Sequence, residues 1–392
     1  MSARVRPGPG FDLLAAYRPD GAFFERGGIG VATAGVHERV APADVADALT
    51  GSHEDEIPDV ALGALPFADA AQGSLAIGRR AVIRFPGHTG VAIAEHGDVA
   101  ADPFELVRGG VAAGAFTAAQ LREVPPAADY ERAVVAATDR IRRGELRKVV
   151  LARTIEVEAD RALDPRRLAH RLRAVNPAAY TFAMPVDGGI LVGATPELLV
   201  SRLGLVVRSN PLAGSAPRAG DPEEDRANAE ALRASAKDRE EHAIVVEDVI
   251  ATLRPLCDQL TWDLEPVLLE TPNVWHLSTR FVGRLKEPAP SALQLALALH
   301  PTPAIAGTPT GAALAAIAEL EPFDRGAYAG PVGWVDATGD GEWAIALRCA
   351  LLDGPRATLY AGAGIVADSD PASEADETER KFRAFLDALR WG

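Results

Sequence analysis

The alternation of apolar and polar residues is clearest in the segment KVVLARTIEVEA (Lys148–Ala159). Its apolar residues Val149, Leu151, Ile155 and Val157 fall at alternate positions, a spacing that places their side chains on one face of a strand. The preceding segment, from about Asp129, repeats its apolar residues at helical spacing, and Gly144 is typical of a helix end. The sequence therefore predicts a helix followed directly by a strand, with Lys148 at the start of that strand and on its other face.

The same patterns predict the remaining elements and an α+β fold in one large domain, residues 1–392. The first hundred residues are expected to form short strands. The expected elements are a strand with glycine kinks at Gly27–Gly35, a hairpin around Pro86–Gly90, a helix capped by Asp164 and Pro165, a strand at Gly188–Thr195 broken by Pro196, a loop at Asn210–Gly220, helices that begin at Asp221 and Ser235, a loop at His300–Pro309 with a helix after it, a hairpin turning at Gly339–Gly341, a strand ending in Tyr360–Val366, and a last helix from Asp370 to Trp391.

Composition narrows the class of protein. The 392 residues are 48% apolar and 24% charged, a normal globular balance, and their net charge of −15 disfavours binding to nucleic acid. We expect a cytoplasmic protein, since the chain shows neither a secretory signal nor an apolar run long enough to span a membrane. Cys257 and Cys349 fit no zinc or redox spacing and are expected to be small buried residues.

Lysine is rare in this chain. Of the 40 basic residues only Lys148, Lys237, Lys286 and Lys381 are lysine. Arginine stays charged at any working pH, whereas a desolvated lysine can lose its proton and act as a base. A lysine at the start of an apolar strand is therefore a candidate functional residue, although a GC-biased, arginine-rich composition would also leave a few lysines by chance.

Several carboxylates are candidates for chemistry, each with a simpler interpretation. Glu374 and Glu377 fall on the last predicted helix, where Lys381 follows Glu377 by one turn and could form an exposed salt bridge with it. A second acidic cluster spans Asp238–His242 and could be a solvated helix face. Carboxylates from two helices would also suit Mg²⁺, a hard cation that binds oxygen ligands. Glu197, directly after Pro196, could be a general acid or a turn residue.

Eight motifs occur in an order that resembles the chorismate-utilising enzymes, a family that includes isochorismate synthases, salicylate synthases and the large subunits of anthranilate and aminodeoxychorismate synthases. The resemblance covers roughly residues 130–390. It implies one large domain in which two antiparallel sheets pack as a sandwich flanked by helices, with a cleft that holds Mg²⁺ and chorismate. The motifs are KVVLAR, GATPELLV, PLAGSAPR, KDREEH, NVWHL, HPTPAIAG, ELEPFDRGAYAGPVGWVDATGDGEWAIALRCA and YAGAGIVADSDPASEADETERK.

The resemblance also implies roles for individual residues. Lys148 matches the base that activates water and Glu197 the acid that protonates the leaving hydroxyl, while Glu241 and Glu377 match metal-binding carboxylates. Burial would favour both the neutral lysine and the protonated carboxyl group that this chemistry needs. The residues matched to positions around the substrate are Gly214, His276, Ala304, Arg348, Gly362 and Lys381.

The loop HPTPAIAG points to one branch of the family. Its Ala304 and Ile305 resemble isochorismate synthases of siderophore pathways, whereas salicylate synthases tend to carry Thr in place of Ala304. Ala213 disfavours aminodeoxychorismate synthase, which has a nucleophilic Lys there. We therefore expect an Mg²⁺-dependent isochorismate synthase, monomeric and without an obligatory glutaminase partner. The alternatives are a salicylate synthase, an ammonia-dependent anthranilate-type synthase and a non-catalytic chorismate-binding protein, and Tyr360 leaves residual lyase activity open.

Overall fold

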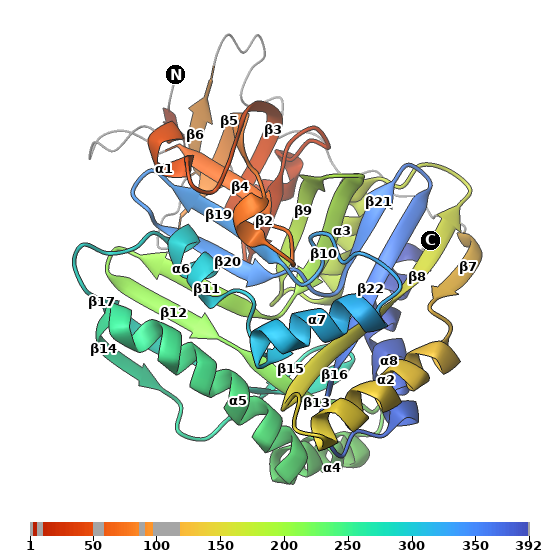
Figure 1. The fold of residues 1–392 in the computed structure, drawn as a ribbon. Helices are drawn as coiled ribbons and strands as arrows, with labels where there is room; N and C mark the ends of the chain where they lie inside the picture. Colours follow the sequence, from red (N-terminus) through yellow and green to blue (C-terminus); the bar gives the residue numbers. More distant parts are fainter. Residues whose placement is uncertain (1–2, 6–10, 50–58, 86–90, 97–117, 391–392) are drawn as a thin grey trace.

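The structure, a computed structural model, describes residues 3–5, 11–49, 59–85, 91–96 and 118–390 (Figure 1). Its helices are α1 (Val45–Ala48), α2 (Ala127–Arg142), α3 (Pro165–Val175), α4 (Pro222–Ala234), α5 (Ala236–Leu253), α6 (Ala292–Leu299), α7 (Thr310–Leu320) and α8 (Pro371–Arg390). Its strands are β1 (Ala3–Val5), β2 (Phe23–Arg26), β3 (Ile29–Val40), β4 (Val60–Ala64), β5 (Leu75–Arg84), β6 (Val91–Glu95), β7 (Ala118–Val124), β8 (Lys148–Ala159), β9 (Tyr180–Val186), β10 (Gly189–Thr195), β11 (Leu198–Leu203), β12 (Val206–Asn210), β13 (Leu212–Pro217), β14 (Cys257–Trp262), β15 (Val267–Glu270), β16 (Val274–Ser278), β17 (Phe281–Leu285), β18 (Gly307–Thr308), β19 (Pro331–Asp336), β20 (Gly341–Ile345), β21 (Cys349–Asp353) and β22 (Arg356–Ile365).

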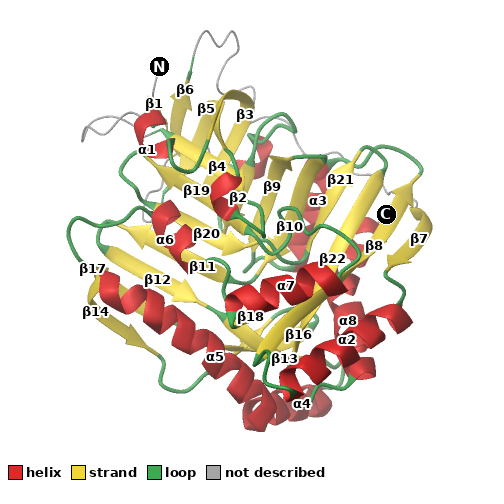
Figure 2. Cartoon of the chain, viewed as in Figure 1, coloured by secondary structure: helices red, strands yellow, loops and turns green. Residues whose placement is uncertain are grey.

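The strands form one large antiparallel sheet and one small one, which confirms the predicted α+β class. The large sheet is a continuous ladder whose order is β14–β17–β12–β11–β20–β19–β4–β5–β3–β2–β9–β10–β21–β22–β8–β7. The small sheet has three strands, with β16 between β13 and β15. The helices lie around the strands, with α4 and α5 along one side and α2, α7 and α8 near β8 and β22 (Figure 2).

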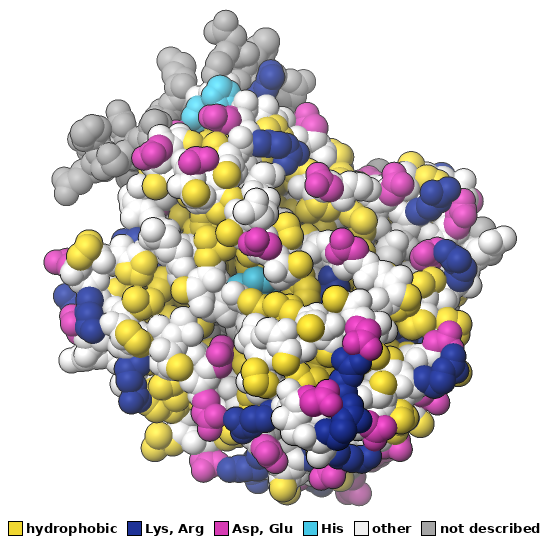
Figure 3. Space-filling model, viewed as in Figure 1, with side chains coloured by type: hydrophobic (Ala, Val, Ile, Leu, Met, Phe, Trp, Pro, Cys, Tyr) yellow, Lys and Arg dark blue, Asp and Glu magenta, His cyan; other side chains and the backbone are white. Residues whose placement is uncertain are grey.

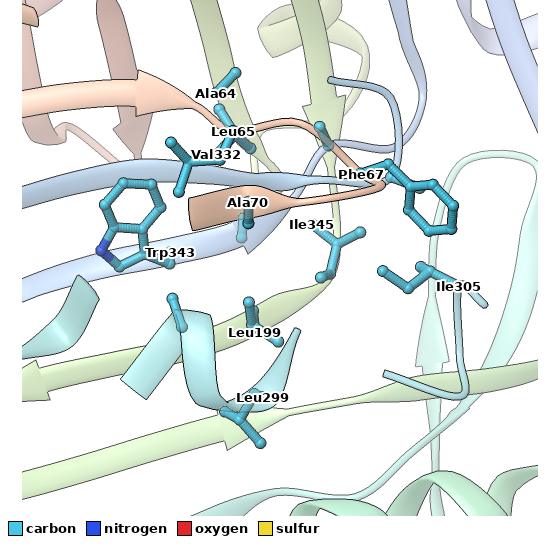
Figure 4. Close-up of a cluster of buried hydrophobic side chains, with 14 of the residues drawn as sticks. Ala64, Leu65, Phe67, Ala70, Leu199, Leu299, Ile305, Val332, Trp343 and Ile345 are labelled. Carbon is cyan, nitrogen blue, oxygen red and sulfur yellow. The ribbon is translucent and has the colours of Figure 1, made fainter. Parts of the chain in front are cut away.

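The two ends of the large sheet, one with β11, β19 and β20 and the other with β8, β9 and β10, contribute side chains to a common apolar core, as expected for a layered fold. One buried cluster joins Trp343 of β20 to Phe182 of β9 and Leu151 of β8. Figure 4 shows part of this cluster, in which Phe67 and Ile305 come from loops and approach the strand residues. A second cluster lies where α3 and α8 cover β8, β9, β10 and β22, and it includes Leu168 of α3 and Phe382 of α8. Burying these apolar side chains is the main force that holds the layers together.

Most of the expected elements are confirmed. The strand predicted at Lys148–Ala159 is β8 with the same bounds, and the predicted hairpin at Gly339–Gly341 joins β19 to β20. Asp164 caps α3 by accepting hydrogen bonds from Arg166 N and Arg167 N, and Ser235 caps α5 in the same way. The predicted strands around Pro86–Gly90 are β5 and β6, which pair as expected, but the turn itself lies outside the described residues. β3 is longer than the short strands expected for this region.

The loop predicted at Asn210–Gly220 is wrong in its central part. Leu212–Pro217 forms β13, which pairs with β16 in the small sheet. The register shifts between Ala213 and Ser215, because Gly214 lies between them at φ 73°, in the left-handed region. The small side chains and the proline suggested a loop, whereas the partner strand lies about sixty residues further along the chain and leaves no local signal.

The structure also shows where the two cysteines and the charged side chains lie. Cys257 and Cys349 are buried and free, as predicted. Acidic and basic side chains are interspersed on the lower part of the face in Figure 3, so the negative net charge is not gathered in one patch there. Of the helices in the described part of the chain, none combines the length and apolar character needed to cross a membrane.

Candidate active site

One cleft brings together nearly all of the residues that the sequence singled out. Its walls come from the turn before β11, from β13, from the first turns of α5, from β16, from the loop before β18, and from β22 and α8. All of the predicted site residues except Lys148 line this cleft: Glu197, Gly214, Glu241, His276, Ala304, Arg348, Gly362, Glu377 and Lys381. The fold therefore gathers side chains that are up to about 180 residues apart in sequence.

Lys148 lies directly behind the wall of the cleft. It is the first residue of β8, its side chain is fully buried, and its Nζ is 2.9 Å from Oε1 of Glu241, which does line the cleft. Gly364 of the neighbouring strand makes room for this pair, since a Cβ at Gly364 would lie 2.2 Å from Glu241 Oε1. Lys148 therefore reaches the cleft through a carboxylate, and any side chain at Gly364 would displace that carboxylate.

Glu197 is a buried carboxyl group that can exchange a proton near neutral pH. It follows Pro196 in the break between β10 and β11 and is 4% exposed. Burial raises the pKa of Glu197 to about 7, against the opposing effects of a hydrogen bond from the Leu212 backbone and of the cations Lys148, Arg348 and Lys381. Perturbation by burial in a cleft with charged partners is typical of functional carboxyl groups.

His276 is held as a neutral imidazole between two partners. Its Nε2 lies 3.2 Å from Nη2 of Arg348, which can only donate, so Nε2 accepts that hydrogen bond. The Nδ1–H group then donates to the Gly214 carbonyl at 3.2 Å. Burial and the charges of Arg348 and Lys381 lower the pKa of His276 to about 3. The histidine thus orients Arg348 without adding a charge to the cleft.

Arg348 is also held in an unusual backbone conformation. Its φ is 49°, in the left-handed region that residues other than glycine seldom adopt. Arg348 follows β20, and its half-buried side chain lines the cleft. Such strained residues persist only where the surrounding structure holds them, and they cluster at functional sites.

Three lysines and three glutamates pair one to one in and behind the cleft. Lys148 pairs with Glu241 and Lys381 with Glu377, and Lys237 Nζ lies 2.9 Å from Oε1 of Glu374. The sequence suggested the Lys381–Glu377 pair from its spacing. It named Glu374 only as a candidate carboxylate and gave no role to Lys237, and the side chains of both line the cleft. The contact between α8 and the start of α5 that brings these two together is visible only in three dimensions.

The carboxylates fit a hard divalent cation in chemistry and in electrostatics. Burial raises the pKa of Glu374, and the negative charge of Glu377 raises it further. Burial also acts to raise the pKa of Glu377, but Lys381 outweighs it and the pKa lies below its usual range. Among the described residues no three His, Cys, Asp or Glu side chains converge on one point. Mg²⁺ does not need such a set, since it commonly takes one or two carboxylates and keeps its waters.

The loop that carries Ala304 is tied to the strand that carries Lys148. Gly307 and Thr308 of β18 pair with Val149 and Lys148, and the Ile305 side chain is packed into the apolar core (Figure 4). These contacts fix Ala304 in the wall of the cleft close to the start of β8.

A buried ion pair strengthens this link, and the sequence gave no separate role to its residues. Arg325 donates to the carbonyls of Ile305 at 2.9 Å and Val150 at 2.8 Å, and its guanidinium carbon lies 4.3 Å from the Phe67 ring centroid. Arg325 also pairs with Glu321 at 2.6 Å, and Glu321 in turn accepts a hydrogen bond from Ala152 N. Both residues lie in the ELEPFDRGAYAG motif, which was the available signal.

Comparison with known proteins places these features in a family. Residues 112–390 match the family described as chorismate binding enzyme. The chain is 46% identical over 276 residues to isochorismate synthase DhbC of Bacillus subtilis, covering 69% of each chain. It is 43% identical over 267 residues to isochorismate synthase EntC of Escherichia coli K12, covering 68% of each chain. The structure of MenF, the menaquinone-specific isochorismate synthase from E. coli, superimposes with a TM-score of 0.86 at 26% identity, over 99% of this chain and 94% of that one.

Proposed function

The chain belongs to the family of chorismate-binding enzymes, and on this premise we propose that it is an isochorismate synthase that uses Mg²⁺ and acts as one domain, residues 1–392. The observation that carries the proposal is the buried carboxyl group of Glu197, with a pKa of about 7, in the same cleft as the cations Arg348 and Lys381. Relatives at 40–46% identity that carry the name isochorismate synthase support the choice of reaction.

The reaction requires one group that takes a proton and another that gives one. Water adds to C2 of chorismate and hydroxide leaves from C4 as the ring double bond shifts, so the net change is an isomerisation. We assign the donation to Glu197, which can carry a proton at neutral pH, and the removal of a proton from water to Lys148. To accept that proton, Lys148 must present a neutral amine with a free lone pair, and in this structure its Nζ lies 2.9 Å from Oε1 of Glu241.

Substrate binding needs local positive charge, because chorismate is a dianion and the chain carries a net charge of −15. We assign this role to Arg348 and Lys381, whose half-buried cations line the cleft. The carbonyl of Gly362 accepts a hydrogen bond from Lys381 Nζ. Gly214 leaves space beside Asp238, because a Cβ at Gly214 would lie 3.0 Å from the Asp238 Cβ. His276 keeps Arg348 oriented toward the cleft.

Glu241 and Glu377 are the residues that would hold Mg²⁺, and Glu374 is placed to support them. When bound, Mg²⁺ supplies positive charge for a substrate carboxylate. Glu241 also contacts Lys148, so the proposed base and the proposed metal site share one carboxylate. We further propose that the protein acts in the cytoplasm as a monomer without a glutaminase partner. The names of its relatives connect the product with siderophore or menaquinone synthesis.

The product assay tests this function directly. Purified protein is incubated with chorismate and Mg²⁺, with and without ammonium, and the products are separated and pyruvate is measured. Isochorismate without pyruvate is the expected result. Salicylate with equimolar pyruvate would contradict the assignment based on Ala304, and a product that appears only with ammonium would move the protein to the anthranilate branch.

The pH dependence of kcat/KM should follow the protonation of Glu197. A general acid works only while it carries its proton, and the pKa of Glu197 is about 7. We therefore expect kcat/KM to fall as the pH rises above about 7, approaching tenfold per unit. Initial rates measured between pH 6 and 9 at saturating Mg²⁺ check this. A profile that stays flat up to pH 9 would rule out Glu197 as the acid.

Replacing Glu377 by alanine should weaken the affinity of the protein for Mg²⁺. We expect the Mg²⁺ concentration for half-maximal activity to rise by about 10- to 100-fold, the range seen when groups that hold or orient a metal are removed. Asp376→Ala is the matched control, since Asp376 is exposed on the same helix. An unchanged Mg²⁺ titration for Glu377→Ala would remove this residue from the metal site.

A further inference from the structure

A second cavity adjoins the active-site cleft and has a different electrostatic character. We call it the antechamber. It is bordered by Val175 at the end of α3, by the turn Thr271–Val274 between β15 and β16, and by three cations: Arg348, Arg380 and Lys381. Arg348 and Lys381 also line the cleft, so these two side chains belong to the walls of both cavities. Among the described residues that line the antechamber, no side chain is acidic.

Arg380 is the cation of the antechamber that the proposed chemistry leaves unused. It lies on α8 directly before Lys381 and is half-buried. Its Nε is buried without a hydrogen-bond partner among the described residues, and no carboxylate of the described chain pairs with its guanidinium. By contrast, Lys381 pairs with Glu377 and Arg348 contacts His276. An unpaired guanidinium at an apolar wall is a favourable place for a carboxylate.

The other side of the cleft carries the opposite charge. There Asp238, Glu241 and Glu374 line the cleft with Lys237, and Lys148 lies behind Glu241, so three carboxylates outnumber two lysines. A dianion that approached from that side would meet a negative field, whereas a metal cation would be attracted. The two sides therefore suit different ligands, a cation on the α5 side and an organic anion on the antechamber side.

We propose that the antechamber is the approach site for the carboxylates of the substrate, and that Arg380 captures the anion before Arg348 and Lys381 receive it. This inference rests on the proposed function for the identity of the anion, chorismate. Positive side chains framed by apolar walls focus the field and raise the association rate of an anion, by about 10- to 10³-fold, and salt screens the effect. Arg380 acts on arrival and not in the chemical step.

The test compares Arg380→Gln with Arg383→Gln. Arg383 is exposed on the same helix and does not line the antechamber. The Arg383→Gln variant therefore removes one positive charge, as Arg380→Gln does, but leaves the antechamber unchanged. Chorismate association is followed by stopped-flow intrinsic fluorescence at several salt concentrations, and kcat and KM are measured in parallel. We expect Arg380→Gln to slow association about tenfold at low salt, to lower kcat/KM mainly through KM, and to flatten the salt dependence. Arg383→Gln should keep the wild-type values, and Arg380→Lys should keep most of the wild-type association rate.

Several outcomes would overturn the proposal. Equal association rates for the two glutamine variants would show that Arg380 does not capture the anion, and a loss confined to kcat would place it in the chemistry. If Arg380→Gln does not fold, the wild-type salt series decides, because association that does not slow with salt excludes capture by these cations. Absence of isochorismate from the wild-type protein would overturn the proposed function instead, since the association measurement needs no turnover.

Discussion

Replacing Glu197 by glutamine is expected to lower kcat by about 10²- to 10⁴-fold, the usual contribution of a positioned proton donor. The change keeps the shape of the side chain but removes the acidic proton. The amide oxygen can still accept the hydrogen bond from the Leu212 backbone, and the backbone contacts of residue 197 with Thr195 and Ile345 do not involve the carboxyl group. The fold should therefore be retained, as measured by thermal unfolding.

Glu342→Gln is the matched control for this experiment. Glu342 is half-buried and burial raises the pKa of its carboxyl group, but it accepts a hydrogen bond from Tyr180 and does not line the cleft. We expect this variant to turn over chorismate at close to the wild-type rate. If Glu197→Gln kept more than about a tenth of the wild-type kcat, another group would have to be the acid.

The second large effect is expected on stability. Arg325→Met should destabilise the protein by about 3–5 kcal/mol, because it leaves the Glu321 carboxylate buried without its partner. It also removes the donor to the Ile305 and Val150 carbonyls, both of which flank the cleft. Thermal unfolding and denaturant titration measure the loss. Removing Glu321 as well, in Glu321→Leu/Arg325→Met, should recover part of the stability, since no unpaired buried charge remains.

An exposed ion pair provides the comparison for Arg325. Arg239 pairs with Glu265 at 2.7 Å, but the two side chains are 43% and 73% exposed. Arg239→Met should change the stability very little, because solvent screens such pairs. If both methionine variants unfolded at the same temperature, the buried Arg325–Glu321 pair would not be the link that holds the Ala304 loop to β8.

Local sequence pattern was sufficient to predict those elements whose signals lie within the element itself. The alternation in Lys148–Ala159, the caps at Asp164 and Ser235 and the turn at Gly339–Gly341 each depend on neighbours in sequence, and each is confirmed. The prediction for β13 was wrong because its partner β16 is distant in sequence and its own residues are small. A strand of this kind is defined by pairing and not by propensity.

The candidate site shows the same division. The motifs marked residues that line the cleft, but their one-to-one lysine–glutamate pairing depends on how α5, α8 and β8 meet. The sequence could suggest Lys381 with Glu377, which are one helical turn apart. It could not suggest Lys237 with Glu374, which lie 137 residues apart on different helices. The roles of these residues remain predictions until the variants are measured.

The scarcity of lysine gives the protein a property useful at the bench. Lys286 is the one exposed lysine, Lys237 and Lys381 lie in the cleft, and Lys148 lies behind it. An amine-reactive reagent will therefore modify Lys286 first, and its slower reactions will fall on Lys237 and Lys381 in the cleft. Mass spectrometry of the modified peptides then reports the occupancy of the cleft, and Lys286 serves as the internal standard.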